Sequence, residues 1–286
     1  MTIEAGTIDP ADTGSPPAAV PAKVYRHRLA TRIWHWINAV TIFVMLMSGL
    51  MIFNAHPRLY WGQYGANFDH PWLQIGAMGE TGFLRIGSTT IETTGLLGRW
   101  TGPEGAMVNR AFPGWATIPS SYSLADARHW HLFFALVLGF GLLFYMVASL
   151  LNRHIQRDIA LTRADVAPGH LWQDIKDHAR LRFPKGLAAL RYNPIQKMTY
   201  LAVIFVLIPL VILTGLTMSP GMNAAWGWLV DLFGGRQSAR SLHFIAAAGI
   251  AAFIVVHLIL VVLAGPINEV RSMITGWFRI PQEKGA

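Results

Sequence analysis

The residues of this sequence best suited to chemistry are histidines placed in long apolar segments. Four of them, His35, His131, His243 and His257, lie in or at the ends of such segments. Burying a histidine in a membrane-spanning helix is costly, so each is a candidate for function. The chain has no cysteine, which excludes disulfides, thiolate-bound zinc, cysteine-ligated iron–sulfur clusters and c-type haem. Any metal is therefore held by His, Met, carboxylate or backbone groups.

The apolar segments have the length that crosses a bilayer. Each has about the 20 residues that a transmembrane helix needs, and none contains an acidic residue; they cover 33–53, 131–151, 198–218 and 242–264. Charged residues make up 13% of the chain, about half the roughly 25% typical of soluble domains. We expect an all-α membrane protein, a bundle of four transmembrane helices over 33–264, with a long periplasmic loop at 54–127.

The distribution of Lys and Arg predicts how these helices are oriented. Residues 1–32, 152–196 and 265–286 carry 15 of them, whereas 54–127 and 219–240 carry 6. The positive-inside rule places both termini in the cytoplasm and the 54–127 loop in the periplasm, across a bacterial inner membrane. This topology explains the net charge of +8 without a nucleic-acid partner. We expect a largely disordered cytoplasmic tail at 1–32 and a second cytoplasmic tail at 265–286.

The spacing of the histidines predicts two pairs. His243 and His257 are 14 residues apart, so they leave the fourth helix on one face, about 21 Å apart along its axis. The topology puts His131 at the depth of His243, near the periplasm, and His35 at the depth of His257, near the cytoplasm. Two bis-imidazole sites stacked across a bundle suit two b-type haems. Zinc is disfavoured because it takes three or four protein ligands.

Arginines and glycines accompany these histidines. Three arginines lie one turn nearer the water on the same helix face, since residues i and i+3 are neighbours; they are Arg32 before His35, Arg128 before His131 and Arg240 before His243. Each could clamp a haem propionate, and the alternative is an arginine that snorkels to the interface. Glycines leave room for a macrocycle or for close helix packing; they are Gly49, Gly139, Gly141, Gly215 and Gly249.

The other histidines are expected to hold no cofactor. His129 and His131 are about 200° apart on a helix, so only one of them faces the core. His131 lies deeper in the apolar run and has the arginine at the matching spacing. The remaining histidines are expected to be solvated in tails and loops: His27, His56, His70, His154, His170 and His178.

At these residues the sequence resembles the b-type cytochrome subunits of bacterial nickel–iron hydrogenases and formate dehydrogenases, grouped as bacterial cytochrome b561. The resemblance rests on TRIWHWINA (31–39), on RHWHLFF (128–134) and on the two histidines 14 residues apart. The stretches RQSARSLHF (236–244) and LAGPINEVRSMITGWF (263–278) are similar to a subgroup paired with periplasmic molybdopterin oxidoreductases. The long 54–127 loop departs from the family's shorter connection.

The family implies that His131 and His243 hold one haem and that His35 and His257 hold the other. It also implies electron exchange between a periplasmic redox protein and a membrane quinone, by a subunit rather than a complete enzyme. Polar candidates for an inner quinone site are Asn38, Lys197, Asn268 and Glu269. Three alternatives stay open: a stand-alone haem oxidoreductase acting between quinone and a small oxidant such as superoxide, a proton-conducting protein without haem, and a bare membrane anchor.

Overall fold

The computed structural model of the chain describes residues 23–66, 68–153, 155–180 and 193–280. It is mostly helical, and four helical segments are long and apolar enough to cross a membrane: α1 (Leu29–Phe53), α2 (Leu124–Leu151), a composite third segment (Pro194–Met218) and α8 (Arg236–Ala264). The expectation of four membrane-spanning helices is confirmed at this level. Their outward faces carry exposed apolar side chains that a bilayer would cover, among them Phe43, Leu136, Phe140 and Val262.

All four spanning segments begin earlier than the apolar runs predicted. They start at Leu29, Leu124, Pro194 and Arg236 rather than near residues 33, 131, 198 and 242. A helix continues past its apolar stretch until a capping residue ends it, as at the start of α2, where the Ser123 side chain accepts a hydrogen bond from the backbone N–H of Asp126. As a result Arg32, Arg128 and Arg240 all lie inside helices.

The third spanning segment is not a uniform α-helix. It consists of α4 (Pro194–Ala202), a π-helical turn η4 (Val203–Leu207) and α5 (Ile208–Met218). The turn ends two residues before Pro209, which lacks the N–H that an unbroken helix would use. Two short helices, α6 (Pro220–Ala225) and α7 (Gly227–Leu232), then lead into α8.

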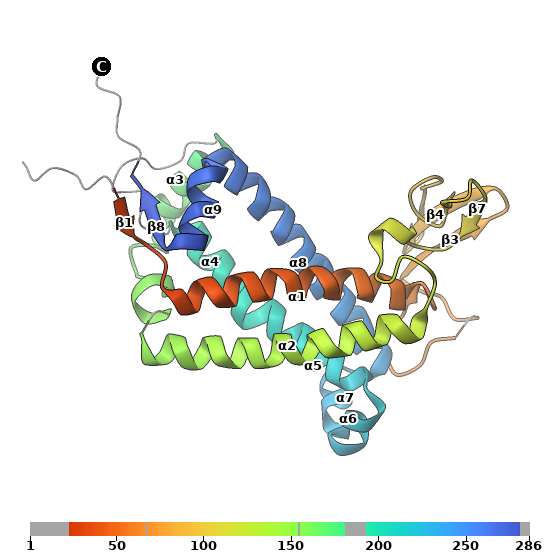
Figure 1. Cartoon of the computed structure of the whole chain (residues 1–286). Coiled ribbons are helices and arrows are strands. Elements are labelled where there is room, and N and C mark those ends of the chain that lie inside the picture. Colours follow the sequence, from red (N-terminus) through yellow and green to blue (C-terminus); the bar gives the residue numbers. More distant parts are fainter. Residues whose placement is uncertain (1–22, 67, 154, 181–192, 281–286) are drawn as a thin grey trace, which may run out of the picture.

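The helices pack as two neighbouring pairs around a common centre. Figure 1 shows α1 alongside α2, and α5 crosses α8. The buried residues at the centre come from all four spanning segments: Ile42, Leu138, Val203, Ile208, Val211, Ala246 and Ile250. This apolar cluster occupies the middle of the bundle, so polar groups are left for its two ends. We refer to the end with strands β3, β4 and β7 as the sheet end, and to the opposite end with β1, β8, α3 and α9 as the terminal end (Figure 1).

The expectation of an all-α protein is wrong for the segment between α1 and α2. This segment forms a four-stranded antiparallel sheet in the order β2-β3-β4-β5, a separate hairpin β6-β7 and a 3-10 turn η1. These elements are β2 (Arg58–Leu59), β3 (Leu73–Met78), β4 (Thr81–Ile86), β5 (Thr89–Glu92), β6 (Arg99–Thr101), β7 (Met107–Asn109) and η1 (Gly114–Ala116). Two tight turns reverse the chain at Gly79 and Gly87, whose φ angles of 59° and 56° favour glycine.

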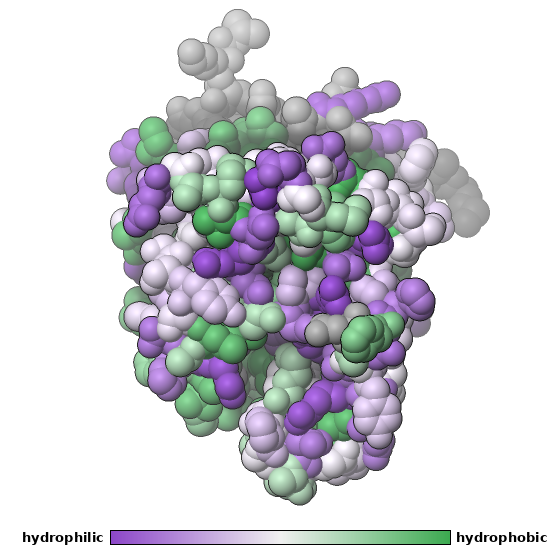
Figure 2. Space-filling view, turned by 90° about the vertical axis from the view of Figure 1, so that its right-hand side faces the viewer, coloured by the Kyte–Doolittle hydropathy of each residue, from purple (hydrophilic) through white to green (hydrophobic). Residues whose placement is uncertain are grey.

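The strand segment has a small core and packs on the bundle. Phe53, Leu59, Leu73, Ile75 and Ala111 are buried together, and Phe244 of α8 packs against them. The segment also caps α8, because the backbone N–H groups of Gln237 and Ser238 donate to the Gly62 carbonyl at 3.1 Å each. Figure 2 shows the molecule from this end, where the surface mixes polar and apolar residues.

At the terminal end, the described residues of the two predicted tails form secondary structure. Strand β1 (Lys23–Tyr25) pairs antiparallel with β8 (Trp277–Arg279), which follows helix α9 (Pro266–Thr275). The π-helical turn η2 (Ile155–Ile159) and α3 (Pro168–Ala179) lie between α2 and α4. The prediction of disorder for residues 1–22 falls outside the described residues, as do residues 281–286. His27, expected to be solvated, is buried beside this strand pair, which joins residues 252 to 256 positions apart in sequence.

Candidate functional site

The four membrane histidines meet as two pairs, one near each end of the bundle. At the sheet end, the ring centroids of His131 on α2 and His243 on α8 are 6.2 Å apart, with planes inclined by 59°. At the terminal end, the centroids of His35 on α1 and His257 on α8 are 6.4 Å apart, inclined by 60°. Each pair therefore joins α8 to a different helix of the α1–α2 pair.

These separations match two imidazoles that share one metal ion from opposite sides. A metal–nitrogen bond of about 2.0–2.1 Å, and roughly 1.1 Å from ring nitrogen to ring centre, give centroids roughly 6.3 Å apart. No group of three or more His, Asp or Glu gathers anywhere in the part of the chain that is described. Each pair thus offers two nitrogens, as in a bis-histidine haem site, and fits that group better than zinc.

The sheet-end histidines are each held by a hydroxyl from the neighbouring helix. His131 Nδ1 lies 3.0 Å from the Ser48 Oγ of α1. His243 Nδ1 lies 3.0 Å from the Thr214 Oγ1 of α5. Because Nδ1 is engaged on both rings, Nε2 is the nitrogen left for a metal. A hydrogen bond at the outer ring nitrogen orients an imidazole that binds a metal.

A glycine follows each of these hydroxyl residues and gives the imidazole its space. A Cβ added at Gly49 would stand 3.4 Å from His131 Cε1, and one at Gly215 would stand 3.5 Å from His243 Cε1. The dipeptides Ser48-Gly49 and Thr214-Gly215 thus have the same role in the two helix pairs. The hydroxyl bonds to the imidazole, and the glycine leaves space for it. Both glycines were predicted to leave space for a cofactor or for helix packing, whereas the two hydroxyl residues were not predicted. A hydroxyl-glycine dipeptide repeated in two apolar helices is the signal that could have revealed them.

The other glycines of the spanning helices have different neighbours. A Cβ at Gly249 would meet Leu207 of the π-helical turn at 3.5 Å, and one at Gly141 would meet Trp34 at 3.9 Å. Nothing among the described residues lies within 4 Å of a Cβ at Gly139. Gly249 and Gly141 therefore support close helix packing, whereas Gly139 lies against open space, and none of the three directly contacts a histidine.

The terminal-end pair has a different environment. His35 Nδ1 is buried and has no hydrogen-bond partner within the described ranges. Phe253, one helical turn from His257 on α8, stacks on that ring at 5.6 Å between centroids. Trp36 Nε1 donates to the Met273 carbonyl of α9 at 3.2 Å, so α9 is fastened beside the start of α1. His35 therefore differs from both sheet-end histidines, whose Nδ1 atoms each bond to a hydroxyl.

Two of the three predicted propionate arginines are bonded to backbone carbonyls. Arg32 donates to the Ile274 carbonyl of α9. Arg240 donates to the carbonyls of His56 and Arg58, at the start of the strand segment. Arg128 is exposed on the first turns of α2. The propionate assignment stays a prediction for all three.

The structure brings His131, rather than His129, against His243, and His129 is exposed. His70 and His170 are also exposed. His154 and the side chain of His178 fall outside the described residues. His56, expected to be solvated, is partly buried, and its Nε2 has no partner in the part of the chain described. Burial, followed by the nearby charges of Arg240 and Arg58, lowers the pKa of His56.

Three of the four predicted quinone-site residues have structural partners. Lys197 forms a 2.9 Å ion pair with Asp165, Glu269 pairs with Arg26 at 3.4 Å, and Asn268 bonds to the Arg279 carbonyl. Hydrogen bonds from the Thr162 backbone and from Lys197 lower the pKa of Asp165 to about 2. These contacts give Lys197, Asn268 and Glu269 structural roles at the terminal end.

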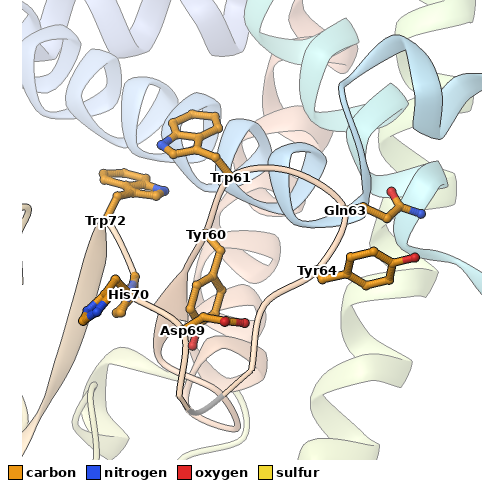
Figure 3. A pocket seen from close by; sticks show the side chains of 8 residues that line it. Tyr60, Trp61, Gln63, Tyr64, Asp69, His70 and Trp72 are labelled. Atoms are coloured by element: carbon orange, nitrogen blue, oxygen red, sulfur yellow. The ribbon is translucent and has the colours of Figure 1, made fainter.

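An aromatic hollow lies beside the first turns of α8 at the sheet end (Figure 3). It encloses about 530 Å³ and is lined by Tyr60, Trp61, Gln63, Tyr64, Asp69, His70, Pro71 and Trp72. Trp61 is half exposed and stacks on Trp72 at 5.7 Å. Trp72 Nε1 in turn donates to Ser241 Oγ at 2.9 Å. The hollow is thus joined to α8 only two residues before His243.

Comparison with known proteins assigns the chain to a family. The profile described as prokaryotic cytochrome b561 matches residues 26–276, which include all four spanning helices and all four paired histidines. The chain belongs to the prokaryotic cytochrome b561 family. This is a family of membrane proteins with b-type haem, and it confirms the resemblance found in the sequence.

Two curated relatives are similar over most of their length. A Cupriavidus necator protein named "Probable Ni/Fe-hydrogenase B-type cytochrome subunit" is 23% identical over 88% of this chain and 86% of its own. An Azospira oryzae protein named "Putative protein-methionine-sulfoxide reductase subunit YedZ1" is 26% identical over 81% of this chain and 87% of its own. No solved structure matches the chain. A membrane electron-transfer role with b-type haem follows for this cytochrome.

Proposed function

We propose that this cytochrome b561 carries electrons across a bacterial inner membrane between a periplasmic oxidoreductase and the quinone pool, through two b-type haems. His131 and His243 hold the haem at the sheet end, and His35 and His257 hold the haem at the terminal end. The observation that carries the proposal is the presence of two histidine pairs with centroid separations of 6.2 and 6.4 Å. When bound, haem supplies a one-electron Fe(III)/Fe(II) couple.

The protein's own residues prepare each site for that group. Ser48 and Thr214 hold the sheet-end rings so that Nε2 faces inward. Phe253 packs on His257 at the terminal end. The apolar cluster at the middle of the bundle separates the two sites and keeps water out of the space between them. His243 and His257 lie about 21 Å apart along α8, which spreads the two sites over most of the bilayer thickness.

The orientation we propose puts the sheet end in the periplasm and both termini in the cytoplasm. The excess of Lys and Arg in the tails and in 152–196 supports it. The aromatic hollow beside α8 supports docking of a redox partner at the sheet end, because Trp72 connects it to the helix that carries His243 (Figure 3). Both curated relatives are named as subunits, which favours a partner enzyme over a stand-alone oxidoreductase. A molybdopterin enzyme is the partner that the sequence resemblance suggests.

The quinone site that we propose lies beside His35 and His257 at the terminal end. Of the four polar candidates, Asn38 lies one turn after His35 on α1, whereas the other three have structural partners. An inner site would draw its protons from the cytoplasm. A quinone-site inhibitor is expected to shift the spectrum of the haem that His35→Ala removes. A shift confined to the haem that His131→Ala removes would contradict this placement.

Transfer of electrons across a sealed membrane tests the proposed function. The purified protein is reconstituted into vesicles that enclose ferricyanide, and dithionite, which does not cross the bilayer, is added outside. We expect reduction of the enclosed ferricyanide to require the protein. It should be lost in His243→Ala and in His257→Ala, because each removes one site, and retained in the matched variant His129→Ala. Equal rates in vesicles with and without the protein would overturn the proposal.

A further inference from the structure

The hydrogen bonds of Ser48 and Thr214 have a definite direction. Ser48 Oγ donates to the Val44 carbonyl of its own helix at 2.7 Å, and Thr214 Oγ1 donates to the Leu210 carbonyl at 2.5 Å. A hydroxyl has one proton, and in each case it is used within the helix. The oxygen lone pairs therefore face the imidazole, so Nδ1 of each sheet-end histidine must be the donor.

This arrangement makes the two histidine pairs chemically unequal. Both sheet-end imidazoles donate Nδ1–H to an oxygen, and both oxygens belong to side chains that are fully buried. At the terminal end, His35 Nδ1 is buried without a partner within the described ranges. A hydrogen bond donated from the outer ring nitrogen makes a metal-binding imidazole more basic. Each sheet-end imidazole is therefore a stronger electron donor than the imidazole of His35.

We infer that Ser48 and Thr214 are positioning residues that make the sheet-end site the lower in redox potential of the two. This inference rests on the proposed function, since it takes His131 and His243 as haem ligands. A more basic axial ligand stabilises Fe(III) over Fe(II), so it lowers the midpoint potential of the iron that it holds. Ser48 and Thr214 act through the histidines and need no contact with the haem.

The consequence is a downhill direction for electrons within the protein. An electron that enters at the sheet end moves toward the higher potential beside His35 and His257. This suits delivery from a partner at the sheet end to an acceptor at the terminal end. The difference in redox potential comes from two hydroxyls in matching positions, one in each helix pair. Each hydroxyl residue is followed by a glycine that leaves space for the imidazole.

The test is a redox titration of the purified protein with haem counted per chain. The haem that is lost in His131→Ala identifies the sheet-end site, and we expect it to have the lower midpoint potential. Ser48→Ala and Thr214→Val should each raise that potential and leave the other haem unchanged. The low-spin ferric EPR signal of the same haem should move with it. Ser48→Thr and Thr214→Ser keep the hydroxyl and should behave as the wild type.

Thr41→Val is the matched control, because Thr41 is a fully buried hydroxyl residue of α1 that bonds to no histidine in the described structure. It should leave both potentials unchanged. The inference is overturned if Ser48→Ala and Thr214→Val retain both haems with unaltered potentials, or if the sheet-end haem has the higher potential. A wild-type protein with no haem would instead contradict the proposed function. Loss of haem in Ser48→Ala, with rescue by Ser48→Thr, would support the positioning role.

Discussion

The Arg240 guanidinium donates a hydrogen bond to the Arg58 carbonyl at 2.9 Å and so ties the strand segment to α8. Arg240 also donates to the His56 carbonyl and lies over the Phe53 ring, 5.7 Å from its centroid. It stands one helical turn before His243. The segment between α1 and α2 is therefore fastened at the helix that contributes a histidine to both pairs.

Arg240→Met should loosen the strand segment. Hydrogen bonds that involve a charged group contribute about 1.5–3 kcal/mol each, and Arg240 makes two of them, so we expect a loss of about 3 kcal/mol or more in the opening free energy of this segment. Limited proteolysis within 54–122, in lipid nanodiscs, measures the change. Arg236→Ala, at the first residue of the same helix, is the control and should be cleaved at the wild-type rate. Unchanged proteolysis in Arg240→Met, with loss of haem, would favour the propionate role instead.

Single and double histidine variants should reveal the pairing. His131→Ala and His243→Ala should each lose one haem per chain, and the double variant should lose no more than either single one. His35→Ala and His257→Ala should behave alike for the other haem. Haem counted per chain by absorbance of the pyridine complex checks this. If His131→Ala combined with His243→Ala lost both haems, the pairing within each end would be incorrect.

The space beside His131 depends on Gly49. Gly49→Ala should keep both haems, because its Cβ would lie at 3.4 Å from the imidazole, near ordinary contact distance. Gly49→Val adds two methyl groups that the ring cannot avoid, so it should remove most of the sheet-end haem. Gly139→Val is the matched control, since a Cβ there has no neighbour within 4 Å among the described residues. Equal haem content in the two valine variants would contradict this account.

His56 should make the stability of the protein fall in mild acid. Its pKa in the folded protein is below 6.5, mainly because of burial, so the unfolded chain binds a proton more readily. The stabilising effect of neutral His56 is present above about pH 6.5 and is lost as the pH falls toward the folded pKa. We expect a thermal unfolding midpoint that drops between pH 7 and pH 5.5, and drops less in His56→Gln. Identical slopes for the two proteins would contradict this.

The Asp165–Lys197 ion pair should affect stability rather than quinone chemistry. Both side chains are largely buried, and Lys197→Met would leave the carboxylate of Asp165 without its ion-pair partner. We expect a lower unfolding temperature, with the rate of haem oxidation by quinone unchanged. Stopped-flow absorbance with a soluble quinone analogue measures that rate. If oxidation of the haem by quinone were tenfold slower in a stably folded Lys197→Met protein, Lys197 would belong to the quinone site.

The helices and the histidine pairs were predictable because each depends on a local pattern. Hydropathy over 20 residues predicts the spanning segments, and a 14-residue spacing places His243 and His257 on one face. The helix starts were missed because apolar runs end before helices do. The strands at 54–127 were missed because they are short, although Gly79 and Gly87 mark two of their turns. The contacts of Ser48 and Thr214 with the histidines could not be predicted, because they depend on how neighbouring helices pack. The pairing of β1 with β8 depends on tertiary structure in the same way.

The most direct test of the central claim is a dithionite-reduced minus oxidised absorption spectrum of the purified protein, with haem quantified per chain. We expect b-type bands and two haems per chain, one for each histidine pair. One haem per chain would mean that one of the two pairs does not bind haem. A protein without haem would contradict the proposed function and would favour a role for the four histidines in proton conduction.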